Sequence, residues 1–228
     1  MDTALKIVTF NVKCGWYGKT LDGIAALLRE VDADIVGLQE VDVNTRRSMK
    51  HSDVVNQVEY IAEKSGYKYW YFAKALDYQG GAYGHGVLSK HPILKSTVIW
   101  PDAQTEGNEA RNIERHEIQV GDKVVGFHNC HLDFQQGPAQ YKEIEVKYMT
   151  RDQYSIFVGD MNTRVDRLDG VVDTEKFELL PGKARIDHVI VSKDTIDYEK
   201  DEEGNGRYII ETETSDHNLI YALLTLKG

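Results

Sequence analysis

Polar residues able to bind metal ions or move protons stand at the ends of apolar segments in this 228-residue chain. Asn11, Glu40, His131 and Asp160 each follow a run rich in Val, Ile or Phe, and such runs predict β-strands. Asn162 follows Asp160 by two positions. The pattern therefore predicts polar side chains at the carboxyl ends of several strands.

A second group of polar residues stands where apolar segments begin. Asp187 lies near the start of residues 186–192, and Asp216 and His217 come just before residues 218–226. In antiparallel neighbours the end of one strand lies beside the start of the next. We therefore expect both groups to meet along one edge of the packed sheets, where they would form an acidic pocket.

The carboxylates of this pocket predict a bound cation. Glu40, Asp160 and Asp216 in one cleft would repel one another unless they were protonated or neutralised. Magnesium prefers a few carboxylate oxygens and keeps several waters, whereas zinc would require more histidine or thiol ligands. We expect Mg²⁺ here, with Mn²⁺ as the alternative.

The histidines of the pocket supply proton-transferring groups. His131 and His217 could hydrogen-bond phosphoryl oxygens or transfer protons, and Asp187 could fix the tautomer of one of them. If the strand before Asp160 continues, Asp160 and Asn162 share one of its faces, because side chains alternate along a strand. The two side chains could then bracket one water.

The remaining pattern predicts a sheet-rich protein in which strands outnumber helices. Helices are expected over residues 20–31, around 54–62, from Pro138 to about 151, and briefly within 167–180. Strands are expected over residues 5–12, 34–41, 67–75, 86–89, 94–100, 112–120, 123–131, 154–159, 186–192, 208–212 and 219–226. The early strand-helix-strand order predicts parallel pairing and the later turns predict antiparallel pairing, so a mixed sheet or two packed sheets follow.

Composition narrows the classes of function. Lys and Arg total 27 and Asp and Glu 37, which gives a net charge of −10 and argues against a protein that coats duplex DNA. Cys14 and Cys130 form no zinc-binding pattern and are expected as buried thiols. We see no linker, transmembrane segment or signal peptide, and expect one domain over residues 1–228. The compartment and the oligomeric state are left open.

Seven short blocks of the sequence, taken in chain order, resemble the motifs of the endonuclease/exonuclease/phosphatase superfamily. The resemblance extends from residue 5 to 226, and the blocks are Thr9-Phe10-Asn11, Leu38-Gln39-Glu40-Val41, Tyr83-Gly84-His85-Gly86-Val87-Leu88-Ser89, Asn129-Cys130-His131-Leu132, Gly159-Asp160-Met161-Asn162, Arg185-Ile186-Asp187-His188 and Ser215-Asp216-His217. This resemblance implies a four-layer α/β/β/α sandwich, in which two packed mixed sheets lie between outer helices and the site lies at one sheet edge.

The resemblance also implies a role for each metal-binding or catalytic residue. It makes Glu40 the principal magnesium ligand, supported by Asn11, and places Asp216 close to the metal. Asp160, with Asn162 beside it, would orient or deprotonate the attacking water. His217, held by Asp187, and His131 would contact phosphate or transfer protons.

Three further positions bear on substrate binding. Arg111 stands where relatives often place a phosphate-contacting arginine, although a plain surface arginine is an equal alternative. His85 and His188 replace the Asn and Tyr that are usual in the family. His85 is a candidate for substrate contact. For both His85 and His188 the alternative is a histidine that is merely packed in the fold or exposed on the surface.

The favoured hypothesis is a divalent-metal-dependent hydrolase of a phosphodiester or phosphomonoester, acting by in-line attack of water. A small phosphoester substrate is favoured because no loop is dense in Lys or Arg, apart from Arg46, Arg47 and Lys50. A DNA-acting endonuclease or exonuclease is the alternative, so nucleic acid is a possible but not a favoured partner. A catalytically inactive binding module is a third hypothesis, which the full set of proposed catalytic residues disfavours.

Overall fold

The computed structural model describes all residues from Met1 to Gly228 and contains two mixed β-sheets. One sheet has the strand order β11-β13-β1-β2-β4-β3, with β12 paired to β13, and the other has the order β5-β6-β7-β8-β10-β9. The strands are β1 (Thr3–Asn11), β2 (Ile35–Val43), β3 (Tyr69–Tyr78), β4 (Gly81–Ser89), β5 (Ile93–Ile99), β6 (Ile113–Val120), β7 (Lys123–His131), β8 (Tyr154–Asp160), β9 (Phe177–Leu179), β10 (Asp187–Ser192), β11 (Ile196–Tyr198), β12 (Tyr208–Ile210) and β13 (Leu219–Leu226).

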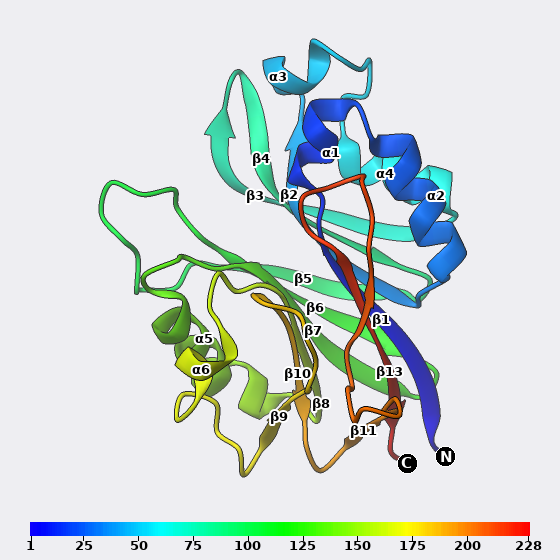
Figure 1. The fold of residues 1–228 in the computed structure, drawn as a ribbon, viewed down its shortest axis with the longest axis vertical. Helices are drawn as coiled ribbons and strands as arrows, with labels where there is room; N and C mark the ends of the chain where they lie inside the picture. Colours follow the sequence, from blue (N-terminus) through cyan, green and yellow to red (C-terminus); the bar gives the residue numbers. More distant parts are fainter.

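Helices cover the outer faces of the two sheets (Figure 1). α2 and α4 lie outside the sheet that carries β1 and β2, and α5 lies on the opposite side of the molecule, outside the second sheet (Figure 1). The helices are α1 (Lys13–Gly18), α2 (Leu21–Val31), α3 (Arg46–Met49), α4 (Gln57–Ser65), α5 (Gly137–Lys147), the 3₁₀ turn η1 (Met149–Arg151) and α6 (Val165–Leu168). None of the helices is long and apolar enough to span a membrane.

Three apolar clusters separate the four layers. Ile7, Phe127 and Val189 belong to a cluster of 18 buried residues between the sheets. A second cluster lies under α2 and α4, and a third lies under α5. Removing this apolar surface from water is the main favourable term that holds the layers together. The expected four-layer α/β/β/α sandwich of two packed mixed sheets is confirmed.

Each sheet contains one parallel pair, and these two pairs point their carboxyl ends to the same region. β1 runs parallel to β2 with Asn11 opposite Gln39, and β7 runs parallel to β8 with His131 opposite Asp160. All other strand pairs are antiparallel. This topology gathers residues from both sheets at one edge.

The expected elements differ from the observed ones mainly where glycine or short segments are involved. β3 and β4 form a long hairpin around Gln79 and Gly80, whose positive φ angles of 46° and 85° suit a two-residue turn, so β4 begins five residues earlier than expected. The short strands β9 and β11 and the short helices α1 and α3 were not expected. The expected short helix within residues 167–180 is wrong in its position, because α6 ends at Leu168 and β9 begins at Phe177.

Candidate active site

Glu40 reaches the site because the backbone of β2 is irregular at this residue. Its φ is +55°, and the register between β2 and β4 shifts between Gln39 and Val41, which defines a β-bulge. A bulge redirects a side chain out of the alternating pattern and is common beside active sites. Gly84 lies opposite Val41, and a Cβ at Gly84 would lie 1.9 Å from the Ala73 carbonyl oxygen, so only glycine fits at this crossing.

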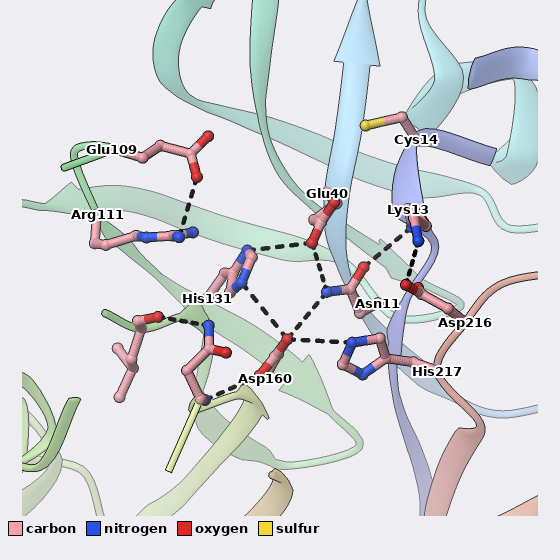
Figure 2. Close-up of polar contacts among 12 residues, drawn as sticks. Asn11, Lys13, Cys14, Glu40, Glu109, Arg111, His131, Asp160, Asp216 and His217 are labelled. Carbon is pink, nitrogen blue, oxygen red and sulfur yellow. Dashed lines mark hydrogen bonds and ion pairs between the residues drawn. The ribbon is translucent and has the colours of Figure 1, made fainter. Parts of the chain in front are cut away.

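Asn11 links the two acidic residues that come from different sheets. Its side-chain nitrogen donates to Glu40 Oε1 and to Asp160 Oδ2, both at 3.0 Å (Figure 2). Its oxygen accepts from the backbone nitrogen of Lys13 at 3.0 Å. Asn11 therefore turns its nitrogen, not its oxygen, towards the carboxylates and supports Glu40 and Asp160, and its place among the metal-site residues stays a prediction.

Asp160 occupies the centre of the site (Figure 2). Its Oδ2 lies 3.5 Å from His131 Nε2 and 3.6 Å from His217 Nε2, and Oδ1 accepts from the backbone nitrogen of Asn162 at 2.9 Å. Burial, followed by repulsion from Asp187, raises the pKa of Asp160 to about 6. A carboxylate with this pKa is suited to accept a proton near neutral pH.

The turn after Asp160 differs from the expected continuation of the strand. β8 ends at Asp160, and Asn162 adopts a left-handed conformation with φ +47°. Its side-chain nitrogen donates to the Leu132 carbonyl at 3.0 Å. Asp160 and Asn162 therefore do not share a strand face; Asn162 ties the end of β8 to the segment that follows His131.

His217 and Asp187 form a hydrogen-bonded pair. His217 Nδ1 lies 3.0 Å from Asp187 Oδ2, and Asp187 begins β10 opposite Asp160 in the register of β8. Burial disfavours the charged ring, but the hydrogen bond and the charge of Asp187, with smaller contributions from Asp160 and Asp216, raise the pKa of His217 to about 9. At neutral pH the ring is therefore a cation between two carboxylates.

His131 stays neutral, in contrast with His217. Burial, together with the charge of Arg111 and the neighbouring histidines, holds its pKa well below the usual range. Its Nδ1 has no hydrogen-bond partner and lies 4.0 Å from Glu40 Oε1. His85 packs edge-on against this ring with centroids 6.3 Å apart. His85 is itself buried, and its role in substrate contact stays a prediction.

Arg111 and Asp216 flank the site from opposite sides. Arg111 comes from the loop before β6, points towards His131, and its Nη2 lies 3.0 Å from Glu109 Oε2 (Figure 2). Asp216 is exposed and forms an ion pair with Lys13 (Figure 2). The partner of Asp216 is thus a lysine at the start of α1, and a single lysine gives no sequence pattern that would predict this contact.

Lys13 reaches Asp216 through an unusual stretch of backbone. Residues Lys13 to Tyr17 have φ between 42° and 64°, so α1 winds left-handed. This conformation costs roughly 1–2 kcal/mol for each residue other than glycine. Contacts to Cys14 hold the turn: Arg47 Nη2 donates to its sulfur at 2.8 Å and Gln57 Nε2 donates to its carbonyl at 2.9 Å.

The donor set fits a hard divalent cation. Glu40 contributes a partly exposed carboxylate, Asp160 a second, and the unpartnered His131 Nδ1 faces the same space. Asp160 and Asp187 also offer carboxylate oxygens within 4.8 Å of each other, whereas the charged ring of His217 has no free lone pair for a metal. Oxygen ligands of this kind suit Mg²⁺ or Mn²⁺ better than zinc, and both cysteines are buried.

Comparison with known proteins agrees with this geometry. The sequence profile of the Endonuclease/Exonuclease/phosphatase family matches residues 8–217. The chain superposes with a TM-score of 0.78 on an endonuclease/exonuclease/phosphatase from Beutenbergia cavernae, at 19% identity over 99% of this chain and 72% of the other. It superposes with a TM-score of 0.75 on a family protein from Bacteroides thetaiotaomicron, at 15% identity over 100% of both chains.

A further structural relative acts on DNA. Zebrafish (D. rerio) TDP2 complexed with a single-strand DNA product gives a TM-score of 0.71 at 17% identity, over 97% of this chain and 99% of the other. A search of curated protein sequences found no match. The family profile spans most of the chain, and with it the whole polar cluster from Asn11 to His217, and ends just before β13. The chain belongs to the endonuclease/exonuclease/phosphatase family, whose members are divalent-metal-dependent enzymes that hydrolyse phosphoester bonds.

Proposed function

We propose that this protein is a magnesium-dependent phosphoesterase that hydrolyses a small phosphodiester or phosphomonoester. The observation that carries the proposal is the position of Asp160 between His131 and His217, with Asn11 connecting it to Glu40. These side chains come from both sheets and offer a base, a charged donor and a metal-binding carboxylate within one site. Residues 1–228 would act as one domain, since neither sheet alone contains this set.

In the proposed reaction Asp160 orients the attacking water and accepts its proton. Its pKa of about 6 leaves it mostly ionised at neutral pH, while its burial keeps it a competent base. Asn11 and the backbone nitrogen of Asn162 fix both carboxylate oxygens, so the base is held in one orientation. The attack is in line with the leaving oxygen, and no covalent intermediate is required.

His217 stabilises charge on the phosphoryl group or donates a proton to the leaving oxygen. Asp187 holds its Nδ1, so Nε2 carries the proton towards the space beside Asp160. Neutral His131 hydrogen-bonds a phosphoryl oxygen, and Arg111 contacts the phosphate once it is released from Glu109. Glu40 would hold the magnesium ion, which would supply Lewis-acid stabilisation of the developing negative charge.

The substrate is proposed to be small because of the charge of the chain. The net charge is −10, and a polyanion gains affinity mainly from cations that displace its counterions. A small ester needs only the metal, the two histidines and Arg111. An aryl phosphodiester satisfies these requirements and provides a convenient assay.

The structural similarity to TDP2 with a single-strand DNA product favours a second candidate, a DNA-acting hydrolase. Hydrolysis of an aryl phosphodiester and nicking of plasmid DNA should be measured side by side, with and without magnesium, at low and moderate salt. We expect magnesium-dependent hydrolysis of the small ester and weak nicking that salt suppresses. Efficient nicking at moderate salt with negligible ester turnover would establish the nuclease instead.

A further inference from the structure

Arg207, directly before β12, is a buried cation without a carboxylate partner. Its residue exposure is 2%, and it forms no ion pair. The other buried lysine or arginine, Lys123, is paired with Asp122. Burying an uncompensated charge is costly, and an arginine cannot escape the cost by losing its proton. The position therefore requires a compensating set of contacts.

The guanidinium of Arg207 binds the segment that begins β10. Nη1 donates to the Asp187 carbonyl at 2.8 Å and lies 2.6 Å from His188 Nδ1, and Nη2 donates to the Gly182 carbonyl at 3.1 Å. A planar guanidinium can serve these three acceptors at once, whereas the single ammonium of lysine cannot reproduce the same fork.

His188 connects Arg207 to a second segment, the turn at Thr163. Because Nδ1 faces the donating guanidinium, the ring proton resides on Nε2, which lies 2.7 Å from the Thr163 carbonyl oxygen. Burial, followed by the charge of Arg207, lowers the pKa of His188 to about 4, so the ring stays neutral. The Asn162–Thr163 turn is thereby tied to Arg207 through a ring of fixed tautomer.

The contacts of Arg207 converge on the chain segments that carry the catalytic groups. Asp187 is opposite Asp160 in the β8–β10 register, and Thr163 lies three residues after Asp160. The charge of Asp187 also acts on Arg207: burial lowers the pKa of the guanidinium to about 10, and Asp187 partly opposes that shift. Arg207 thus contacts the backbone of Asp187, whose side chain holds His217.

We propose that Arg207 is a positioning residue, which braces the start of β10 and the turn after β8 so that Asp160, Asp187 and His217 keep their mutual geometry. The inference rests on the proposed phosphoesterase activity. Residues that orient metal ligands through hydrogen bonds typically contribute about 10- to 100-fold to metal affinity or activity, and we expect a loss of similar size here. Since Arg207 does not touch substrate, its loss should lower kcat and leave KM within about twofold.

The test compares Arg207→Ala and Arg207→Lys with the wild type, using bis-p-nitrophenyl phosphate and magnesium. We expect kcat to fall about 10- to 100-fold in Arg207→Ala, with partial recovery when guanidinium chloride is added at low millimolar concentration. Arg207→Lys should retain the stem and the charge but recover only part of kcat. If Arg207→Ala does not fold, Arg207→Lys carries the same test.

Arg115→Ala is the matched control. Arg115, on β6 of the second sheet, is another largely buried arginine; it pairs with Asp152, and neither residue belongs to the seven family motifs. Its loss should lower the unfolding temperature without lowering kcat, and guanidinium should not stimulate it. Equal losses of kcat in the Arg115 and Arg207 variants, or an unchanged kcat in both Arg207 variants, would overturn the proposal.

A spectroscopic readout separates this proposal from the proposed function. Long-range ¹H–¹⁵N spectra should show the Nε2–H tautomer of His188 in the wild type and its loss or mixing in Arg207→Lys. If the wild type hydrolyses no ester but the His188 tautomer changes in Arg207→Lys as expected, the proposed function is wrong and the structural role of Arg207 is supported. If the His188 signals are identical in both proteins, the brace is wrong whatever the activity.

Discussion

The His217 ring is held by Asp187 through Nδ1 at 3.0 Å, and this contact turns Nε2 towards Asp160. The pair combines a strand start in one sheet with the segment that leads into β13 in the other. The imidazolium is therefore part of both the catalytic geometry and the contact between the sheets. Substitution of His217 is therefore expected to lower both activity and stability, and the two effects can be measured separately.

Replacement of Glu40 should weaken magnesium binding. Glu40→Gln keeps the shape of the side chain but removes the charge of a partly exposed carboxylate. Loss of groups that merely support a metal ligand costs about 10- to 100-fold in affinity, so we expect at least about tenfold here. Calorimetric titration with magnesium measures it, with the exposed Glu59→Gln as the control. Unchanged affinity at matched circular dichroism would remove Glu40 from the metal site.

Replacement of the proton-handling groups should lower turnover. Asp160→Asn and His217→Ala should each reduce kcat at least about 100-fold, because a positioned acid or base typically contributes that much. Steady-state assays on the aryl phosphodiester give the values, and the exposed Asp166→Asn is the control for general effects of a lost carboxylate. Near wild-type turnover in either variant would show that its assigned role is wrong.

The His217–Asp187 pair should make stability depend on pH. The pKa of His217 is raised from 6.5 to about 9, so the stabilising contribution is complete below pH 6.5 and is lost as pH rises through 9. The shift corresponds to an upper limit of about 3 kcal/mol. Urea unfolding of the wild type and His217→Gln should therefore differ more at about pH 6 than at about pH 10. A constant difference would contradict the charged pair.

If Arg111 contacts the bound phosphate, its replacement should change KM more than kcat. Arg111→Ala should raise KM for a phosphomonoester, which carries more charge, by about tenfold, and Arg111→Lys should restore part of the loss. Arg111 is held by Glu109 in the free protein, so Glu109→Gln provides the matching variant with the arginine released. KM values that stay equal in all three variants would make Arg111 a surface residue.

Much of the site could be predicted from sequence because strand ends are easy to locate. Asn11, Glu40, His131 and Asp160 all follow strongly apolar runs, and the structure brings them together where the parallel pairs end. Their catalytic roles remain predictions. The bulge at Glu40 could not be predicted from the sequence. The alternation of apolar and polar residues assigns neighbouring residues to opposite faces of a strand, but it does not show where an extra residue is inserted.

Other features depend on tertiary contacts that no local pattern reports. The left-handed turn from Lys13 to Tyr17 runs against the preferences of its non-glycine residues, and Arg47 and Gln57 contact it through Cys14. Asp216 pairs with Lys13, and the Asp187 carbonyl accepts a hydrogen bond from Arg207, a residue 20 positions away. Isolated basic residues in polar segments give no sequence signal for such contacts.

The arrangement of the sheets also sets the order in which the active site can form during synthesis. One sheet is made entirely from the continuous segment Ile93–Ser192, whereas the other combines β1 to β4 with β11, β12 and β13. β13 pairs with β1 along its length, and His217 stands just before it. A ribosome-bound chain can therefore assemble the sheet that carries His131 and Asp160 early, but it gains a complete catalytic cluster only when the last strand has emerged and docked.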